Sequence, residues 1–281
     1  MQINVFGRTT RNGIEQGKNT EENLYGRNGQ PTNPEGKRLL KDKYNYLLKM
    51  SDSQLLNVLW GATFGLGSLD SILLRSGDLK KILESHYKGR SGKELYVNMP
   101  DSYWSNSFSN DRDGLLREIK YAVQRELESK RWSQFQNYSI DCSSILDKAD
   151  INFRADFINP SLLAPMGGVQ EVVLRTIKVE EKEHRRPMRP TLMDFSTGNH
   201  KDYVITLEIK IRDRFAVDTD DFAFSNWRSN KGKALATALG REALVAFWIL
   251  QHQRGYPPFV WNAIFKSTIN VLSDTSYSPL A

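Results

Sequence analysis

The chain has 281 residues, of which 39% are hydrophobic, and its mean hydropathy is −0.53. These values suit one large globular domain or two smaller ones. The formal net charge of +6 favours an anionic partner, such as nucleic acid, an acidic membrane surface or a pyrophosphate-bearing substrate, without choosing among them. A single cysteine, Cys142, excludes an intramolecular disulfide and a cysteine-based zinc site, and we expect it to be a small buried residue.

Residues 1–36 are rich in glycine, asparagine, threonine and charge, and they lack a periodic apolar pattern. They are predicted to form a flexible leader. They also lack the continuous apolar segment of a signal peptide, so we expect any delivery outside the cytoplasm to use another route.

Residues 37–132 are predicted to form a helical domain. Ser51 offers an N-cap to the segment around Leu55 and Leu59, Asp78 offers one to a short helix, and residues 111–131 have the clearest helical periodicity. Glycine and polar residues interrupt the apolar stretch 55–74, so two short core helices are expected there rather than a membrane span.

Residues 133–281 are predicted to form an α+β domain. Alternation over 151–157, a β-branched run over 172–179 and strict alternation over 203–211 predict strands. A helix is expected over 233–253, followed by an aromatic segment around Trp261. The expected fold class is therefore α+β, with a helical N-terminal half and then an antiparallel, open-barrel-like sheet flanked by helices.

Three carboxylates crowd into four positions after the strand at 203–211, at Asp218, Asp220 and Asp221, and Arg228 follows closely. Like charges this close must be relieved by solvent, by a cation or by shifted protonation. An ordinary turn, with aspartates capping or solvated, is one interpretation. The other is a phosphate site, because Mg²⁺ takes one or two carboxylates plus substrate phosphate oxygens, and the arginine fork suits a phosphate.

The spacing of Asp218, Asp221 and Arg228 resembles the active-site signature of the colicin M family, D-x-Y-D, five residues, then H-R. Asp220 stands where that family has tyrosine, and Trp227 stands where it has histidine. The segments 213–218, 247–251 and 256–259 are also similar to a gammaproteobacterial family associated with interbacterial toxin loci. The resemblance covers the last half of the chain.

The resemblance implies an antibacterial toxin, a Mg²⁺-dependent hydrolase that cuts lipid II between undecaprenyl and pyrophosphate in the periplasm of a target bacterium. It implies Asp218 and Asp221 as metal ligands and, with Arg228, as catalytic residues. Asp220, the third of the crowded carboxylates, is a further candidate catalytic residue. Since Trp227 replaces the histidine, the general acid or base is left to a histidine or to a carboxylate such as Asp221. The candidate histidines are His200, His184 and His252.

The implied partners are lipid II at the membrane surface, an immunity protein and a component of a secretion machine, with no nucleic acid. Injection by a type VI system and release as a bacteriocin are both compatible with this. Two other interpretations stay open. The first is a nuclease toxin that uses the same acidic loop, Mg²⁺ and a basic surface, and the second is a non-catalytic effector or adaptor.

Overall fold

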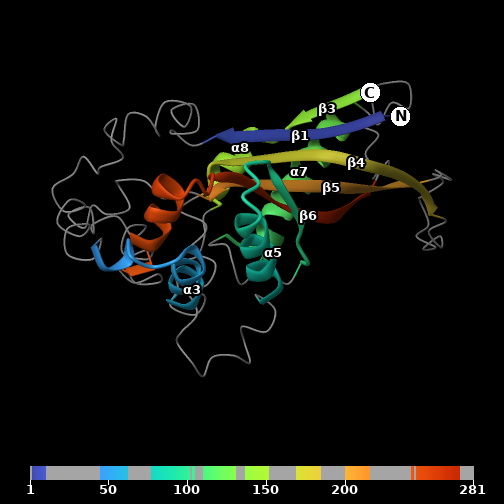
Figure 1. Ribbon diagram of the computed structural model, residues 1–281. Coiled ribbons are helices and arrows are strands. Elements are labelled where there is room, and N and C mark those ends of the chain that lie inside the picture. The colour runs from blue at the N-terminus through green and yellow to red at the C-terminus, as the bar shows by residue number, and fades with distance from the viewer. Residues whose placement is uncertain are drawn as a thin grey trace, which may run out of the picture.

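The computed structural model describes residues 2–10, 45–62, 77–101, 103–104, 110–130, 137–151, 169–184, 200–215, 242–243 and 245–272. Its centre is a six-stranded mixed sheet in the order β2-β6-β5-β4-β1-β3 (Figure 1). The strands are β1 (Gln2–Thr10), β2 (Leu95–Asn98), β3 (Asn137–Asp141), β4 (Glu171–His184), β5 (His200–Phe215) and β6 (Phe259–Leu272).

The middle of the sheet is antiparallel and its two edges are parallel. Strands β1, β4, β5 and β6 pair antiparallel in that order, while β3 joins β1 and β2 joins β6 in parallel. The long β4–β5 pairing shifts register between Thr176 and Lys178. Beside this bulge, the Thr176 hydroxyl accepts a hydrogen bond from the Val5 amide at 2.8 Å, so a side chain continues the ladder from β4 to β1.

One face of the sheet carries the apolar core, because alternate residues of each strand point the same way. In β5 these are Leu207, Ile209 and Ile211, all fully or almost fully buried. Helix α7 (Arg112–Ser129) packs against β6, and helix α8 (Ser143–Ala149) packs against β1. The buried stripe of α7 has a spacing of four residues and consists of Leu115, Ile119, Val123 and Leu127.

Further helices gather at the end of the sheet where β1 and β5 end. They are α3 (Asp52–Ala62), α5 (Gly77–Lys88) and the helical residues 245–253, which are orange-red in Figure 1. Tyr87 of α5 contacts Phe247 edge-on, with ring centroids 5.5 Å apart, and His86 contacts Phe259 at 4.5 Å. We call this end, where Phe215 pairs with Phe259, the proximal end of the sheet.

Several predicted elements are confirmed. Strand β5 includes the alternating residues 203–211, and β4 includes the β-branched run 172–179. Asp111 caps α7, since its side chain accepts hydrogen bonds from the amides of Asp113 and Gly114. Ser51 caps α3 through a reciprocal pair of hydrogen bonds with Gln54, at 2.8 and 3.3 Å. Cys142 is buried, as expected.

Other predictions need correction. The flexible leader is wrong for residues 2–10, which form β1 inside the sheet. A helical N-terminal half is not supported, because β1 and β2 join the same sheet as β4, β5 and β6. The sheet is mixed rather than antiparallel, and the aromatic segment around Trp261 is strand β6. Most of the strand expected over 151–157 lies outside the described residues. Of the helix expected over 233–253, residues 242–243 and 245–253 are helical, and the others lie outside the described residues.

Among the described helices, none is both long enough and apolar enough to cross a membrane. The start of the apolar stretch 55–74 lies in α3, which buries Leu55, Leu56 and Leu59.

Candidate functional site

The segment that carries the predicted site begins at the proximal end of β5. Asp218, Asp220, Asp221 and Arg228, together with Trp227, lie outside the described residues. The described range 200–215 ends at Phe215, three residues before Asp218, and Phe215 is paired with Phe259 of β6. The segment therefore starts from a strand that is paired on both sides.

A buried carboxylate lies just before this start. Asp213 of β5 is 2% exposed and pairs in register with Trp261, which is fully buried. It is on the core face, in phase with Ile209 and Ile211. Because an unpartnered buried carboxylate is costly, a carboxylate at this position requires polar partners. No local pattern in the sequence distinguishes Asp213 from the other polar residues of this strand.

The four histidines of the chain divide between the two ends of the sheet. His184 and His200 pair with each other in register at the distal end of the β4–β5 hairpin. His86 lies at the proximal end, where its ring contacts Phe259 and its Nε2 lies 2.9 Å from the carbonyl oxygen of Lys93. His252 lies in the helical residues 245–253, seven residues before β6 begins, and its ring contacts Trp248 at 5.0 Å.

The length of β5 separates His200 from the acidic segment. At about 3.3 Å per residue, the 16 residues of β5 span about 50 Å between His200 and Phe215. Six residues of chain reach at most about 21 Å from Phe215 to Asp221. His200 and the carboxylates at 218–221 are therefore too far apart to act on one substrate atom, whereas His86 and His252 start from the correct end.

A row of ion pairs crosses the sheet on the face opposite the core, which we call the outer face. Glu171 of β4 is 4% exposed and accepts from Arg8 Nε of β1, while Arg212 Nη1 of β5 lies 3.5 Å from its other oxygen. Arg212 Nη2 also donates to Glu94 at 2.7 Å. The Tyr96 hydroxyl, which donates to Glu94, and the nearby Arg212 hold the pKa of Glu94 below its usual value.

This row has no signal within any single segment of the sequence. Arg8, Glu171 and Arg212 are far apart in the chain, and only the β1–β4 and β4–β5 registers bring them together. A second pair follows the same rule, since Arg175 Nε donates to Glu208 at 2.7 Å across the same two strands, β4 and β5. The outer face thus carries partly exposed cations that are held in place by two buried carboxylates, Glu171 and Glu208, and by the exposed Glu94.

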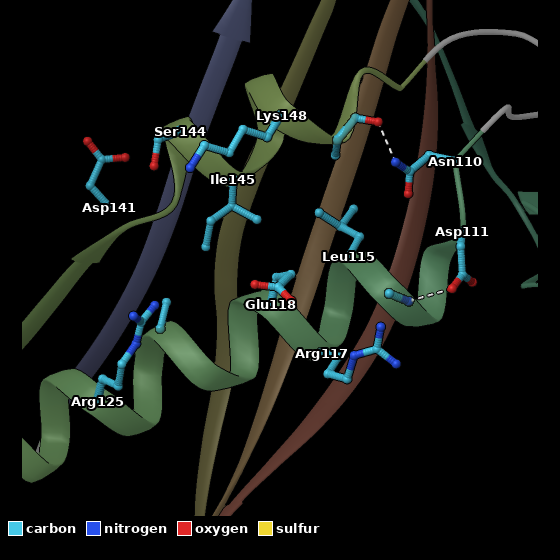
Figure 2. Close-up of a pocket in the computed structure, with 13 residues that line it drawn as sticks. Asn110, Asp111, Leu115, Arg117, Glu118, Arg125, Asp141, Ser144, Ile145 and Lys148 are labelled. Carbon is cyan, nitrogen blue, oxygen red and sulfur yellow. Dashed lines mark hydrogen bonds between the residues drawn. The ribbon is translucent and has the colours of Figure 1, made fainter.

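A separate cavity of about 650 Å³ lies between α7 and α8 (Figure 2). Leu115 and Ile145 lie in its centre, and charged side chains surround them. Two of its carboxylates have local structural roles. Asp111 caps α7, and Asp141 accepts hydrogen bonds from the amide and hydroxyl of Ser143, which lower the pKa of Asp141. These two carboxylates therefore stabilise the start of α7 and the turn that precedes α8.

Within the described residues, no cluster of three or more His, Cys, Asp or Glu side chains is arranged to hold a metal ion. Comparison with protein-family models, with curated proteins and with solved structures finds no match for this chain.

Proposed function

We propose that this chain is an antibacterial toxin that hydrolyses lipid II between undecaprenyl and pyrophosphate in the periplasm of a target bacterium. The observation that carries the proposal is the spacing of Asp218, Asp221 and Arg228. Its support is that this segment follows directly from β5, a strand paired on both sides, with a buried Asp213 near its end.

The donor set suits Mg²⁺, because hard cations prefer carboxylate oxygens and Mg²⁺ keeps positions for substrate phosphate oxygens. Asp218 and Asp221 would hold the ion, which when bound neutralises the charge that develops on the pyrophosphate. Arg228 would donate its planar fork to the same phosphate and orient it. Asp220, one position earlier than Asp221, adds to the local negative charge and so favours binding of a cation.

Proton transfer is assigned to a group at the proximal end. Asp221 can accept a proton from the attacking water, and a histidine can give one to the leaving oxygen. His86 and His252 are placed at this end of the sheet, whereas β5 separates His200 from it by about 50 Å. The proposal therefore does not use His200.

The direct test is to incubate the purified chain with lipid II and Mg²⁺ and to measure release of undecaprenol. Asp221→Ala is expected to lower the rate at least about 100-fold, the usual loss when one charge-stabilising group is removed. Asp113→Asn, which changes an exposed carboxylate in the first turn of α7, is the matched control and should keep the full rate. No release, or release undiminished by Asp221→Ala, overturns the proposal.

A toxicity assay separates the two other interpretations. Growth arrest only when the chain is directed to the periplasm agrees with lipid II as substrate. Growth arrest from the cytoplasm would instead indicate a nuclease. A non-catalytic adaptor predicts that Asp218→Ala and Arg228→Ala leave the biological effect intact.

A further inference from the structure

The proximal half of the outer face carries an excess of positive charge. On the described strands β1, β4, β5 and β6, this half presents six cations, and three carboxylates contact them. The cations are Arg8, Arg175, Lys210, Arg212, Arg214 and Lys266, and the carboxylates are Glu94, Glu171 and Glu208. Among these nine described side chains the cations exceed the carboxylates by three, and an excess of positive charge favours an anionic partner.

The carboxylates organise this face more than they neutralise it. Glu171 and Glu208 are 4% and 10% exposed, while their partners Arg8 and Arg175 are 65% and 62% exposed. Each buried carboxylate thus accepts a hydrogen bond from the Nε of its arginine, while most of that arginine side chain stays exposed to solvent. Neither Lys210 nor Lys266 forms a salt bridge with another described residue, although Lys210 lies close enough to Glu94 to help lower the pKa of that carboxylate. Lys266 is exposed, so its charge is available to a partner.

Apolar side chains lie among these cations. In one row across the sheet, Val173, Lys210 and Ile264 are neighbours in register, and all three are partly buried. At the two sides of the face, Phe6 of β1 is 38% exposed and Tyr96 of β2 is 55% exposed. The described helices contact the core side instead, where α8 approaches Gly7 and Arg112 of α7 donates to Ser267.

We propose that the proximal half of the outer face docks onto an anionic phospholipid surface. Cations next to aliphatic side chains match the head groups and the acyl boundary of such a surface, and aromatic side chains at the sides match its interfacial zone. The inference rests on the proposed function for its biological setting, since it would place the segment that follows Phe215 at the level of a lipid-linked pyrophosphate.

Single-stranded nucleic acid fits this face less well. Its binding surfaces combine cations with aromatic side chains on which successive bases stack. Here the centre of the face has valine and isoleucine. The two exposed aromatic residues of this face, Phe6 on β1 and Tyr96 on β2, are separated by three other strands, so successive bases cannot stack on both. The observations therefore favour a lipid surface, and nucleic acid becomes an outcome of the test.

The experiment is flotation of the full chain with vesicles of phosphatidylcholine, with and without phosphatidylglycerol. Binding should require phosphatidylglycerol and decrease at high salt. Lys210→Gln/Lys266→Gln should weaken it about 30-fold, because each basic residue near such a surface contributes roughly one kcal/mol. The matched control is Lys81→Gln/Lys148→Gln, which removes the same charge from α5 and α8 and should bind as the wild type does.

Tyr96→Ser provides a second variant that keeps the charge and should weaken vesicle binding several-fold. Absence of binding, or equal loss in both lysine pairs, overturns the inference. So does tighter binding to a single-stranded oligonucleotide that depends on Lys210 and Lys266. Hydrolysis of lipid II in detergent micelles is measured in parallel. If the wild-type chain hydrolyses lipid II in micelles but does not bind the vesicles, only the docking face is refuted. If it binds the vesicles but does not hydrolyse lipid II, only the proposed function is refuted.

Discussion

Gly7 of β1 is the point where α8 comes closest to the sheet, and Gly7→Ala tests that contact. A Cβ added at Gly7 would lie 3.0 Å from the carbonyl carbon of Cys142, 3.0 Å from the amide nitrogen of Ser143 and 3.1 Å from Cδ1 of Leu146. Two of these three atoms are backbone, so a change of side-chain rotamer cannot relieve the contact. The strand and the helix must move apart.

Overpacking of this kind costs about 1–3 kcal/mol. Replacing glycine by alanine also returns about 0.4–1 kcal/mol, because the unfolded chain loses conformational freedom. We therefore expect Gly7→Ala to lower the free energy of unfolding by about 1–2 kcal/mol, measured by urea denaturation. For a chain of this size the melting temperature should fall by about 2–4 °C for each kcal/mol.

Gly92→Ala is the matched control for this experiment. A Cβ at Gly92 would meet only Pro257 and the Pro258 carbonyl, at 3.4 Å or more, which is ordinary contact. Its stability should stay within about 0.5 kcal/mol of the wild type. If Gly7→Ala is as stable as the wild type, or if both variants lose the same amount, then α8 does not pack on β1 as described.

Three further outcomes are expected. Asp111→Ala should lower the free energy of unfolding by about 1 kcal/mol, whereas Asp111→Asn should retain most of the cap, and equal losses in a urea titration would contradict the capping role. Burial, and then the Asp141 carboxylate, raise the pKa of the Cys142 thiol from 9.0 to about 11. The unfolded chain therefore releases this proton at lower pH than the folded chain, so stability should fall as pH rises from 9 to 11. Cys142→Ala should lack this component, and a constant difference from the wild type across that range would refute it. In the lipid II assay, His86→Gln or His252→Gln should lower the rate of hydrolysis at least about tenfold, while His200→Gln should leave it unchanged. Loss of hydrolysis with His200→Gln alone would contradict the assignment of proton transfer to a histidine at the proximal end.

The sequence predicted those elements whose signal is local. Strand β5 alternates strictly over nine residues, and α7 combines an N-cap at Asp111 with an apolar stripe, so each can be recognised without knowledge of its neighbours. Strand β1 has only Ile3 and Val5 as alternating apolar residues, followed by Gly7 and threonines. It is a strand because β3 and β4 provide its hydrogen-bonding partners, which lie more than a hundred residues away.

The same distinction applies to the candidate sites. The carboxylates at 218–221 and Arg228 are close together in the chain, so their spacing alone predicts a candidate site. The outer-face ion pairs depend on registers such as Glu171 with Arg212, and no single segment shows them. The same registers also separate His200 from the acidic segment, which a list of histidines in the sequence could not do.

Strand β5 connects the proposed docking face with the segment that carries the proposed catalytic residues. Arg212 and Arg214 point to the outer face, and Asp213 between them points into the core, so the last residues before Phe215 belong to both the docking face and the anchored end of the strand. Asp218 is three residues after Phe215, so the two lie within about 11 Å of each other. If the outer face contacts lipid, Asp218 is therefore close to the head groups. The His184–His200 pair would then project about 50 Å along the hairpin from this point. A photoreactive side chain placed at position 214 should crosslink to phosphatidylglycerol, whereas one placed at position 182, at the far end of the hairpin, should not. Equal crosslinking from both positions would refute this arrangement.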